Sequence, residues 1–156
     1  MNKISHGLAL LAASVWVGGM CAIGYLAVPV LFQTLPDRQL AGMLAGKLFA
    51  AMAYTGIVCA LYLLAYYFAQ FGRQAFRQKI FWVIAAMLLL TLAGQFGIQP
   101  ILADLKTLAM PDAVMHSVYA ESFRTWHGVA SIVYLVQSLL GIVLVLKIGV
   151  RPTSPV

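Results

Sequence analysis

The sequence predicts an all-α integral membrane protein built as a four-helix bundle. Of its 156 residues, 63% are hydrophobic and only 9% are charged, whereas soluble domains average about 45–50% apolar and about 25% charged residues. So few charges cannot keep this much apolar surface in water, and lipid must therefore solvate the chain. The composition excludes most soluble enzymes and nucleic-acid-binding modules, and a chain of this length forms one domain.

Four windows without Asp, Glu, Lys or Arg define the expected spans. Each window is longer than the about 20 residues that a helix needs to cross a bilayer, and the four are 4–36, 48–72, 80–103 and 125–146. Lipid offers the backbone no hydrogen-bond partner, so continuous stretches of this length are helices rather than barrel strands. We predict a single membrane domain over 1–150, with a disordered tail at 151–156. Its spans lie near 8–33, 48–70, 80–101 and 126–147.

Local signals refine the ends of these spans. Pro29 predicts a kink or an early end in span one. Asp37 is the expected N-cap of a helix that continues into span two. After Pro111, the 104–124 loop is expected to hold a helical stretch from Val114 to Phe123, whose apolar face lies on the outer membrane surface or caps the bundle.

The distribution of Lys and Arg predicts the orientation. With four spans, the N-terminus, the 71–79 loop and the C-terminus share one side, which carries six basic residues and no acid. The other four basic and four acidic residues cancel on the opposite side, so the whole net charge of +6 lies on one face. The positive-inside rule places that face in the cytoplasm. We therefore expect a multi-pass protein of the inner (plasma) membrane, N-in and C-in, and no nucleic-acid partner.

Small and polar residues recur at helical spacing in every window, which favours a position facing the bundle interior. They are Ser14, Gly18 and Ala22; Thr55, Cys59, Tyr62 and Tyr66; Thr91, Gln95 and Gln99; and His127, Ser131, Tyr134 and Ser138. We assign Trp16, Gly18 and Gly19 to close helix packing.

These stripes have two interpretations. Interhelical packing and hydrogen bonding explain them without any ligand. Alternatively, the polar residues of the outer halves line an outward-facing pocket, whose candidate ligand-binding residues are His127, Ser131, Tyr134, Gln95 and Gln99. No charged residue lies deep in a span, which disfavours an ion pump or a proton relay. Transport of a small molecule stays open as a further hypothesis.

Candidate metal ligands are scattered. His6 and His127 lie at opposite ends of the predicted bundle, about 30 Å apart across the bilayer, which is too far to share a metal ion or a haem. The methionines and cysteines follow no Met-x-x-Met or Cys-x-x-Cys spacing and indicate core packing. The sequence contains no nucleophile elbow, no Walker A loop and no inward pair of acids, so we expect a non-catalytic protein and propose no catalytic residue.

Two stretches resemble a known family. The first is His6 followed by Trp16-Val17-Gly18-Gly19, Tyr25 and Pro29, and the second is Phe123-Arg124-Thr125-Trp126-His127-Gly128. Together they resemble the bacterial relatives of transmembrane protein 205, catalogued as domain of unknown function 4149. The resemblance covers nearly the whole chain and implies its four-span layout, but it implies no activity.

The first stretch is also similar to the copper-resistance D proteins and, more distantly, to the HemJ-type protoporphyrinogen oxidases. That similarity implies haem or copper as a cofactor, with His6 and His127 as the positions to carry over. The main prediction is an inner-membrane protein of unassigned molecular function with a polar pocket. The alternatives are a haem- or copper-binding, redox-active membrane protein and a small-molecule transporter. Expected partners are the lipid bilayer and, as open alternatives, other membrane proteins or a second copy of the chain.

Overall fold

The structure, a computed structural model, describes residues 3–110 and 114–149. Within these ranges the chain is helical nearly throughout and contains no strand. Four helical stretches are long and apolar enough to cross a membrane, namely Ile4–Thr34, Arg38–Arg77, Lys79–Leu108 and Ala120–Gly149. The predicted all-α class with four spans is confirmed. The predicted tail at 151–156 lies outside the described residues.

Three of the spans are built from more than one kind of helix. Span one consists of α1 (Lys3–Ala22), the π-helical segment η1 (Ile23–Ala27) and α2 (Val28–Thr34). Span two is α3 (Arg38–Phe71), extended by the 3-10 segment η2 (Gly72–Arg77). Span three consists of α4 (Lys79–Leu92), the π-helical segment η3 (Ala93–Ile98) and α5 (Gln99–Leu108). A short 3-10 segment, η4 (Val114–His116), precedes span four, α6 (Ala120–Gly149).

The loop expected at 104–124 is shorter in the structure, and the helical stretch expected within it is partly present. The residues at 104–108 belong to α5, which continues span three beyond its predicted end at 101. Between α5 and α6, the described residues form the single 3-10 turn η4, and the last part of the expected stretch, 120–123, already belongs to α6. The expected N-cap at Asp37 is confirmed, because its carboxylate accepts hydrogen bonds from the backbone N–H groups of Gln39 (2.8 Å) and Leu40 (3.1 Å).

Each π-helical segment ends two residues before a proline. Pro29 and Pro100 have no N–H, so neither can donate the hydrogen bond that an unbroken α-helix requires. The backbone changes register just before each one: the Val28 N–H reaches the carbonyl of Ile23, and the Gln99 N–H reaches that of Gly94. The chain therefore passes both prolines and stays helical, whereas the sequence suggested that Pro29 could end the helix and that span three would stop near Pro100.

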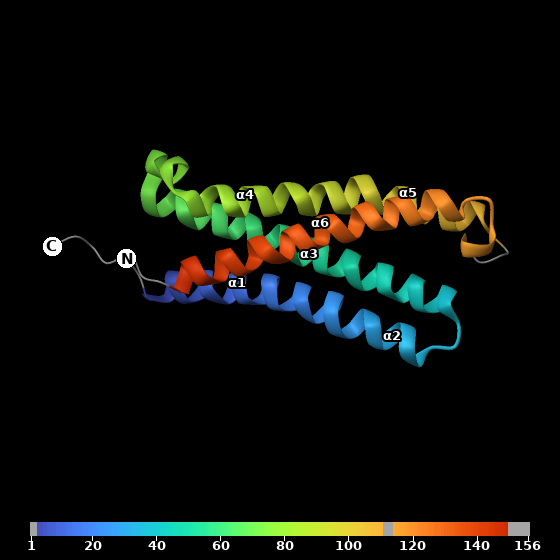
Figure 1. Cartoon of the computed structure of the whole chain (residues 1–156). Coiled ribbons are helices and arrows are strands. Elements are labelled where there is room, and N and C mark those ends of the chain that lie inside the picture. The colour runs from blue at the N-terminus through green and yellow to red at the C-terminus, as the bar shows by residue number, and fades with distance from the viewer. Residues whose placement is uncertain (1–2, 111–113, 150–156) are drawn as a thin grey trace.

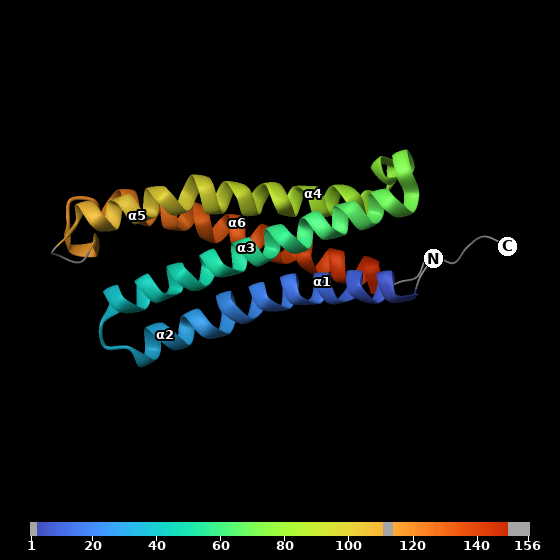
Figure 2. The ribbon, with the colours of Figure 1, turned by 180° about the vertical axis from the view of Figure 1, so that it is seen from behind.

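The two unbroken helices cross the bundle. At the end of the bundle that holds the start of α1 and the end of α6, α1 packs on α6 and α3 packs on α4 (Figure 1). Toward the other end, α3 lies beside α2 and α6 lies beside α5, as the reverse view also shows (Figure 2). The pairs α2–α3 and α5–α6 thus face each other at that end, which we call the loop end of the bundle.

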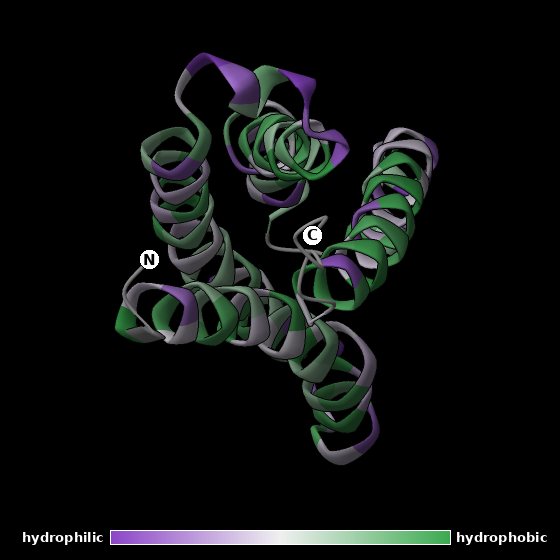
Figure 3. Ribbon diagram, turned by 90° about the vertical axis from the view of Figure 1, so that its left-hand side faces the viewer, coloured by the Kyte–Doolittle hydropathy of each residue, from purple (hydrophilic) through white to green (hydrophobic). Residues whose placement is uncertain are grey.

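The tight core fills the opposite half. Its members come from α1, α3, α4 and α6, and the largest fully buried side chains are Trp16, Leu63, Ile84, Met87 and Leu144. Strongly hydrophilic residues gather on the turn between α3 and α4 and at helix ends, while the helix middles are mainly hydrophobic (Figure 3). This distribution matches an apolar band between two polar surfaces.

The expected small-residue packing stripe of span one is wrong. Ser14, Gly18 and Ala22 are all exposed on the outer face, and a Cβ added at Gly18 would meet no atom within 4 Å. The inward face instead carries Ala9, Ala13, Trp16, Val17 and Met20. In lipid, apolar residues suit either face of a helix, so a four-residue spacing of small residues does not decide which face turns inward.

Close helix approaches occur at other glycines. A Cβ at Gly19 would lie 2.7 Å from the Met52 sulfur, and one at Gly56 would lie 2.9 Å from Cδ1 of Trp16. Both contacts join α1 to α3. The structure thus places Trp16 and Gly19, but not Gly18, at a helix interface.

Candidate functional site

A cavity of about 830 Å³ lies between the facing helix pairs at the loop end. All four spans contribute to its wall, from Trp16 in α1 to Gln137 in α6. Its size is within the range of about 300–1,000 Å³ that is typical of small-molecule sites. The cavity occupies the half of the bundle that the tight core leaves unfilled.

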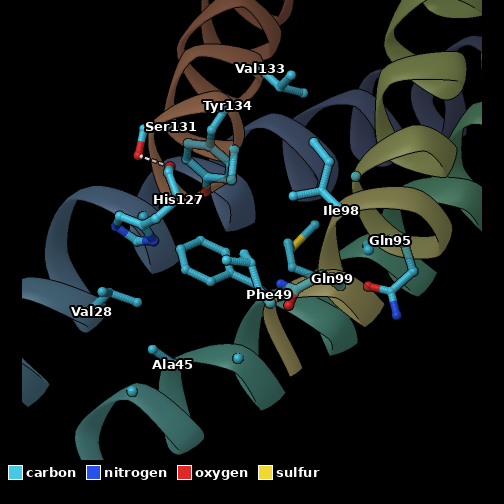
Figure 4. Close-up of a pocket in the computed structure, with 18 of the residues that line it drawn as sticks. Val28, Ala45, Phe49, Gln95, Ile98, Gln99, His127, Ser131, Val133 and Tyr134 are labelled. Atoms are coloured by element: carbon cyan, nitrogen blue, oxygen red, sulfur yellow. Dashed lines mark hydrogen bonds between the residues drawn. The ribbon is translucent and has the colours of Figure 1, made fainter. Parts of the chain in front are cut away.

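The structure brings the five candidate pocket residues to this one cavity. His127, Ser131 and Tyr134 reach it from α6, Gln95 from η3 and Gln99 from the first turn of α5. The Ser131 hydroxyl donates a hydrogen bond of 2.9 Å to the carbonyl of His127 within its own helix (Figure 4). His127 and Ser131 are exposed, whereas the two glutamines and Tyr134 are half-buried.

Tyr134 anchors an aromatic wall of the cavity. Its ring meets Phe49 edge-on, with centroids 5.3 Å apart, and the Phe49 ring lies between Tyr134 and Ala45 in the close-up (Figure 4). Tyr25 also meets Tyr134 edge-on, with centroids 6.0 Å apart. The Tyr25 hydroxyl donates to the hydroxyl of Ser138 (2.9 Å), which donates to the carbonyl of Tyr134 (2.8 Å). Aromatic packing and hydrogen bonds together fix this wall.

The inner end of the cavity is mostly apolar. Trp16, which is only 1% exposed, lines it together with Met20 and Met52. One polar link crosses this region: the Gln137 amide donates a 2.6 Å hydrogen bond to the hydroxyl of Thr91, which donates to the carbonyl of Met87 (2.8 Å). Gln137 and Thr91 are both buried, so the link satisfies their polar groups and joins α4 to α6 without charge.

The outer end of the cavity carries positive charge. Arg38 and Lys106 line it, and none of the acidic residues that the structure describes does. Lys106 is half-buried and crosses from α5 to α3, where its ammonium group donates to the carbonyl of Gly42 (3.3 Å). The same group lies 5.7 Å from the centroid of the Phe123 ring.

Both π-helical segments border the cavity. Gly24 and Tyr25 of η1 lie on one side, and Gly94 and Gln95 of η3 lie on another. A π-helical bulge widens the helix locally and occurs often at functional sites. The prolines that cause these bulges therefore also help to shape the pocket.

His6 lies far from this cavity. It is in the second turn of α1, at the end of the bundle opposite to His127, and the hydroxyl of Tyr66 lies 3.4 Å from its Nδ1. No group of three or more His, Cys, Asp or Glu residues that could hold a metal ion occurs in the described ranges 3–110 and 114–149. The two histidines do not fit a haem or metal site that both would share.

Several residues of the cavity wall were not predicted from the sequence. Gln137 lies three residues after Tyr134, so helical periodicity could have assigned it to the same face. Lys106 was assigned to a loop, because span three was predicted to end at 101, whereas α5 continues to Leu108.

One known protein family matches a large part of the chain. The model of the family described as "Domain of unknown function (DUF4149)" matches residues 11–111. The chain belongs to this family. The matched DUF4149 region includes both π-helical segments and the cavity residues of the first three spans, whereas His127, Ser131 and Tyr134 lie after it. No curated protein and no solved structure gives a significant match to the chain.

Proposed function

We propose that this DUF4149 protein binds a small amphipathic ligand, without chemical conversion, in the cavity at the loop end of the bundle. The observation that carries the proposal is the change in character along the cavity. Trp16, Met20 and Met52 line its inner end, while Gln99, Lys106 and His127 lie nearer the loops. A site of this kind accepts an apolar group inside and a polar group at the surface.

We further propose that the protein lies in the inner membrane with both termini in the cytoplasm, so that the cavity opens outward. The charge distribution supports this orientation. The turn between α3 and α4 carries Arg73, Arg77 and Lys79 without any acid, whereas basic and acidic residues balance at the loop end. Excess Lys and Arg in short loops mark the cytoplasmic side.

Tryptophan fluorescence tests the proposed binding. In vesicles holding the Trp82→Phe/Trp126→Phe variant, Trp16 is the only tryptophan and reports from the cavity. A dibrominated fatty-acid methyl ester, added in increasing amounts, should quench Trp16 along a saturable curve, because the number of sites is limited. A matched variant that keeps only Trp82, which is 59% exposed on the outer surface, should show quenching that follows the bulk lipid concentration.

A blocked cavity provides the control. Gly46 lines the cavity, and a Cβ there would meet no atom within 4 Å, so Gly46→Phe places a ring in the open space. Gly18→Phe places the same ring on the outer face, where there is also room. The saturable signal should disappear in Gly46→Phe and persist in Gly18→Phe. Quenching of Trp16 that never saturates, or that is the same in both variants, would overturn the proposal.

A further inference from the structure

Lys106 stands out among the charged residues at the loop end. Its ammonium group joins two spans, because it reaches from α5 and donates a hydrogen bond to the backbone carbonyl of Gly42 in α3. Its other neighbour is the aromatic face of Phe123. A carbonyl and a ring are favourable for an ammonium group, but they do not neutralise it. None of the acidic residues that the structure describes lines the cavity beside Lys106, which is half-buried in its wall.

The acidic residues that the structure describes at this end do not line the cavity. Asp37 uses its carboxylate to cap α3, through the N–H groups of Gln39 and Leu40. It lines the groove between α3 and α5, which Lys106 also lines, but it does not line the cavity itself. Asp104 and Glu121 are exposed and do not line the cavity. A second cation, Arg38, lies at the rim on the first residue of α3.

The shape of the site limits the rest of the ligand. The cavity extends along α3 from Arg38 to Ala53, which is about 20 Å at the rise of an α-helix. Beyond Lys106, the wall is formed by apolar and aromatic side chains such as Phe49, Ile98 and Met52. A space that is long, mainly apolar and charged at one end suits a chain with a terminal anionic group.

We propose that the ligand is an anionic amphiphile with a single hydrocarbon chain, whose head group binds Lys106 with Arg38 at the rim and whose chain extends toward Trp16. This inference rests on the proposed binding function and adds the charge of the ligand to it. A carboxylate and a phosphate head share the required chemistry. A free fatty acid and a membrane lysophospholipid are the two sources that the experiment separates.

The test compares matched probes in the single-tryptophan Trp16 protein. The probes are a dibrominated fatty acid, ionised at the pH used, its neutral methyl ester, and a brominated lysophosphatidic acid. Neutral vesicles carry the protein, and the apparent Kd of each probe comes from the saturable quenching. Because hydrogen bonds to charged groups are the stronger ones, the ionised acid should bind about tenfold more tightly than its ester.

Three substitutions assign this preference to Lys106. Lys106→Gln should reduce the ratio between acid and ester to near one, and Lys106→Arg should retain it, because the charge is kept. Arg124→Gln removes an exposed positive charge that does not line the cavity, and it should leave the ratio unchanged. Loss of the Lys106–Gly42 hydrogen bond alone would weaken acid and ester equally, so the ratio separates charge recognition from a structural role.

The outcomes are distinct. If acid and ester bind equally well to the unsubstituted cavity, the anionic assignment is overturned while the binding function stands. Absence of saturable quenching by every probe would overturn both. Tighter binding of the fatty acid or of the lysophosphatidic acid would support the assignment and identify the source of the head group.

Discussion

The hydroxyl of Tyr134 in α6 donates a hydrogen bond to the backbone carbonyl of Met20 in α1. Met20 lies three residues before the π-helical segment η1, and the Tyr134 ring rests against Gly24 within that segment. The Tyr134 side chain therefore joins α6 to the place where span one changes its hydrogen-bond register.

Tyr134→Phe tests the hydrogen bond alone, since it removes the hydroxyl and keeps the ring. We expect the free energy of unfolding to fall by about 1 kcal/mol, the usual scale for one interhelical hydrogen bond. This free energy is measured by unfolding the protein in mixed micelles with increasing amounts of a denaturing detergent. Ser131→Ala is the matched control, because that hydroxyl bonds only to its own helix, and its effect should be near zero. Equal effects of the two variants would contradict the prediction.

Gly24→Ala tests the close approach of the ring. A Cβ at Gly24 would lie 2.6 Å from the hydroxyl oxygen of Tyr134 and 2.7 Å from Cζ. The forced displacement should destabilise the protein by about 1–3 kcal/mol, as overpacking does. Gly18→Ala should be neutral or slightly stabilising, because the space there is open and alanine is the better helix former.

A double-mutant cycle assigns the Gly24 effect to Tyr134. Once Tyr134→Ala has removed the ring, Gly24→Ala should cost much less than it does alone. Residues in contact commonly show coupling of about 0.5–3 kcal/mol. Additive effects in the same unfolding assay would show that the cost of Gly24→Ala has another cause, such as the backbone of η1.

The buried link between Gln137 and Thr91 should couple α4 to α6. In a cycle of Gln137→Leu and Thr91→Val, we expect a coupling energy of about 0.6 kcal/mol, and up to about 1.7 kcal/mol, as measured for polar contacts between membrane helices. Thr55, whose hydroxyl bonds to its own helix at Ala51 (3.0 Å), replaces Thr91 in the control cycle. Coupling of the same size in that control would exclude a specific link.

Cysteine labelling tests the proposed orientation. In a Cys21→Ala/Cys59→Ala background, which lacks other cysteines, Thr107→Cys and Gln74→Cys place single thiols on exposed positions at opposite ends of the bundle. A membrane-impermeant maleimide added to intact cells should label position 107 and should label position 74 only after permeabilisation. The reverse pattern would place both termini outside.

Most of the candidate site could be predicted, because one helix carries much of it. His127, Ser131 and Tyr134 follow the spacing of a single helical face, and Gln95 and Gln99 do the same in span three. The structure assigns all five to one cavity. Periodicity could not supply the partners across helices, such as Phe49 beside Tyr134 or Gly42 beside Lys106, since these depend on how the spans cross.

The sequence alone determined the fold class and the number of spans, because lipid requires long apolar stretches whose backbone hydrogen bonds are satisfied internally. The capping of α3 by Asp37 could also be predicted, because it is a local interaction. The capping side chain bonds to N–H groups only two and three residues ahead. The tertiary structure decided which face of each helix turns inward, and it placed Gly18 outward. It also decided that Pro29 and Pro100 lie inside continuous spans and that a cavity opens at the loop end. Lipid and protein interior are both apolar, so hydrophobicity does not distinguish them, and only the packing of the four helices does.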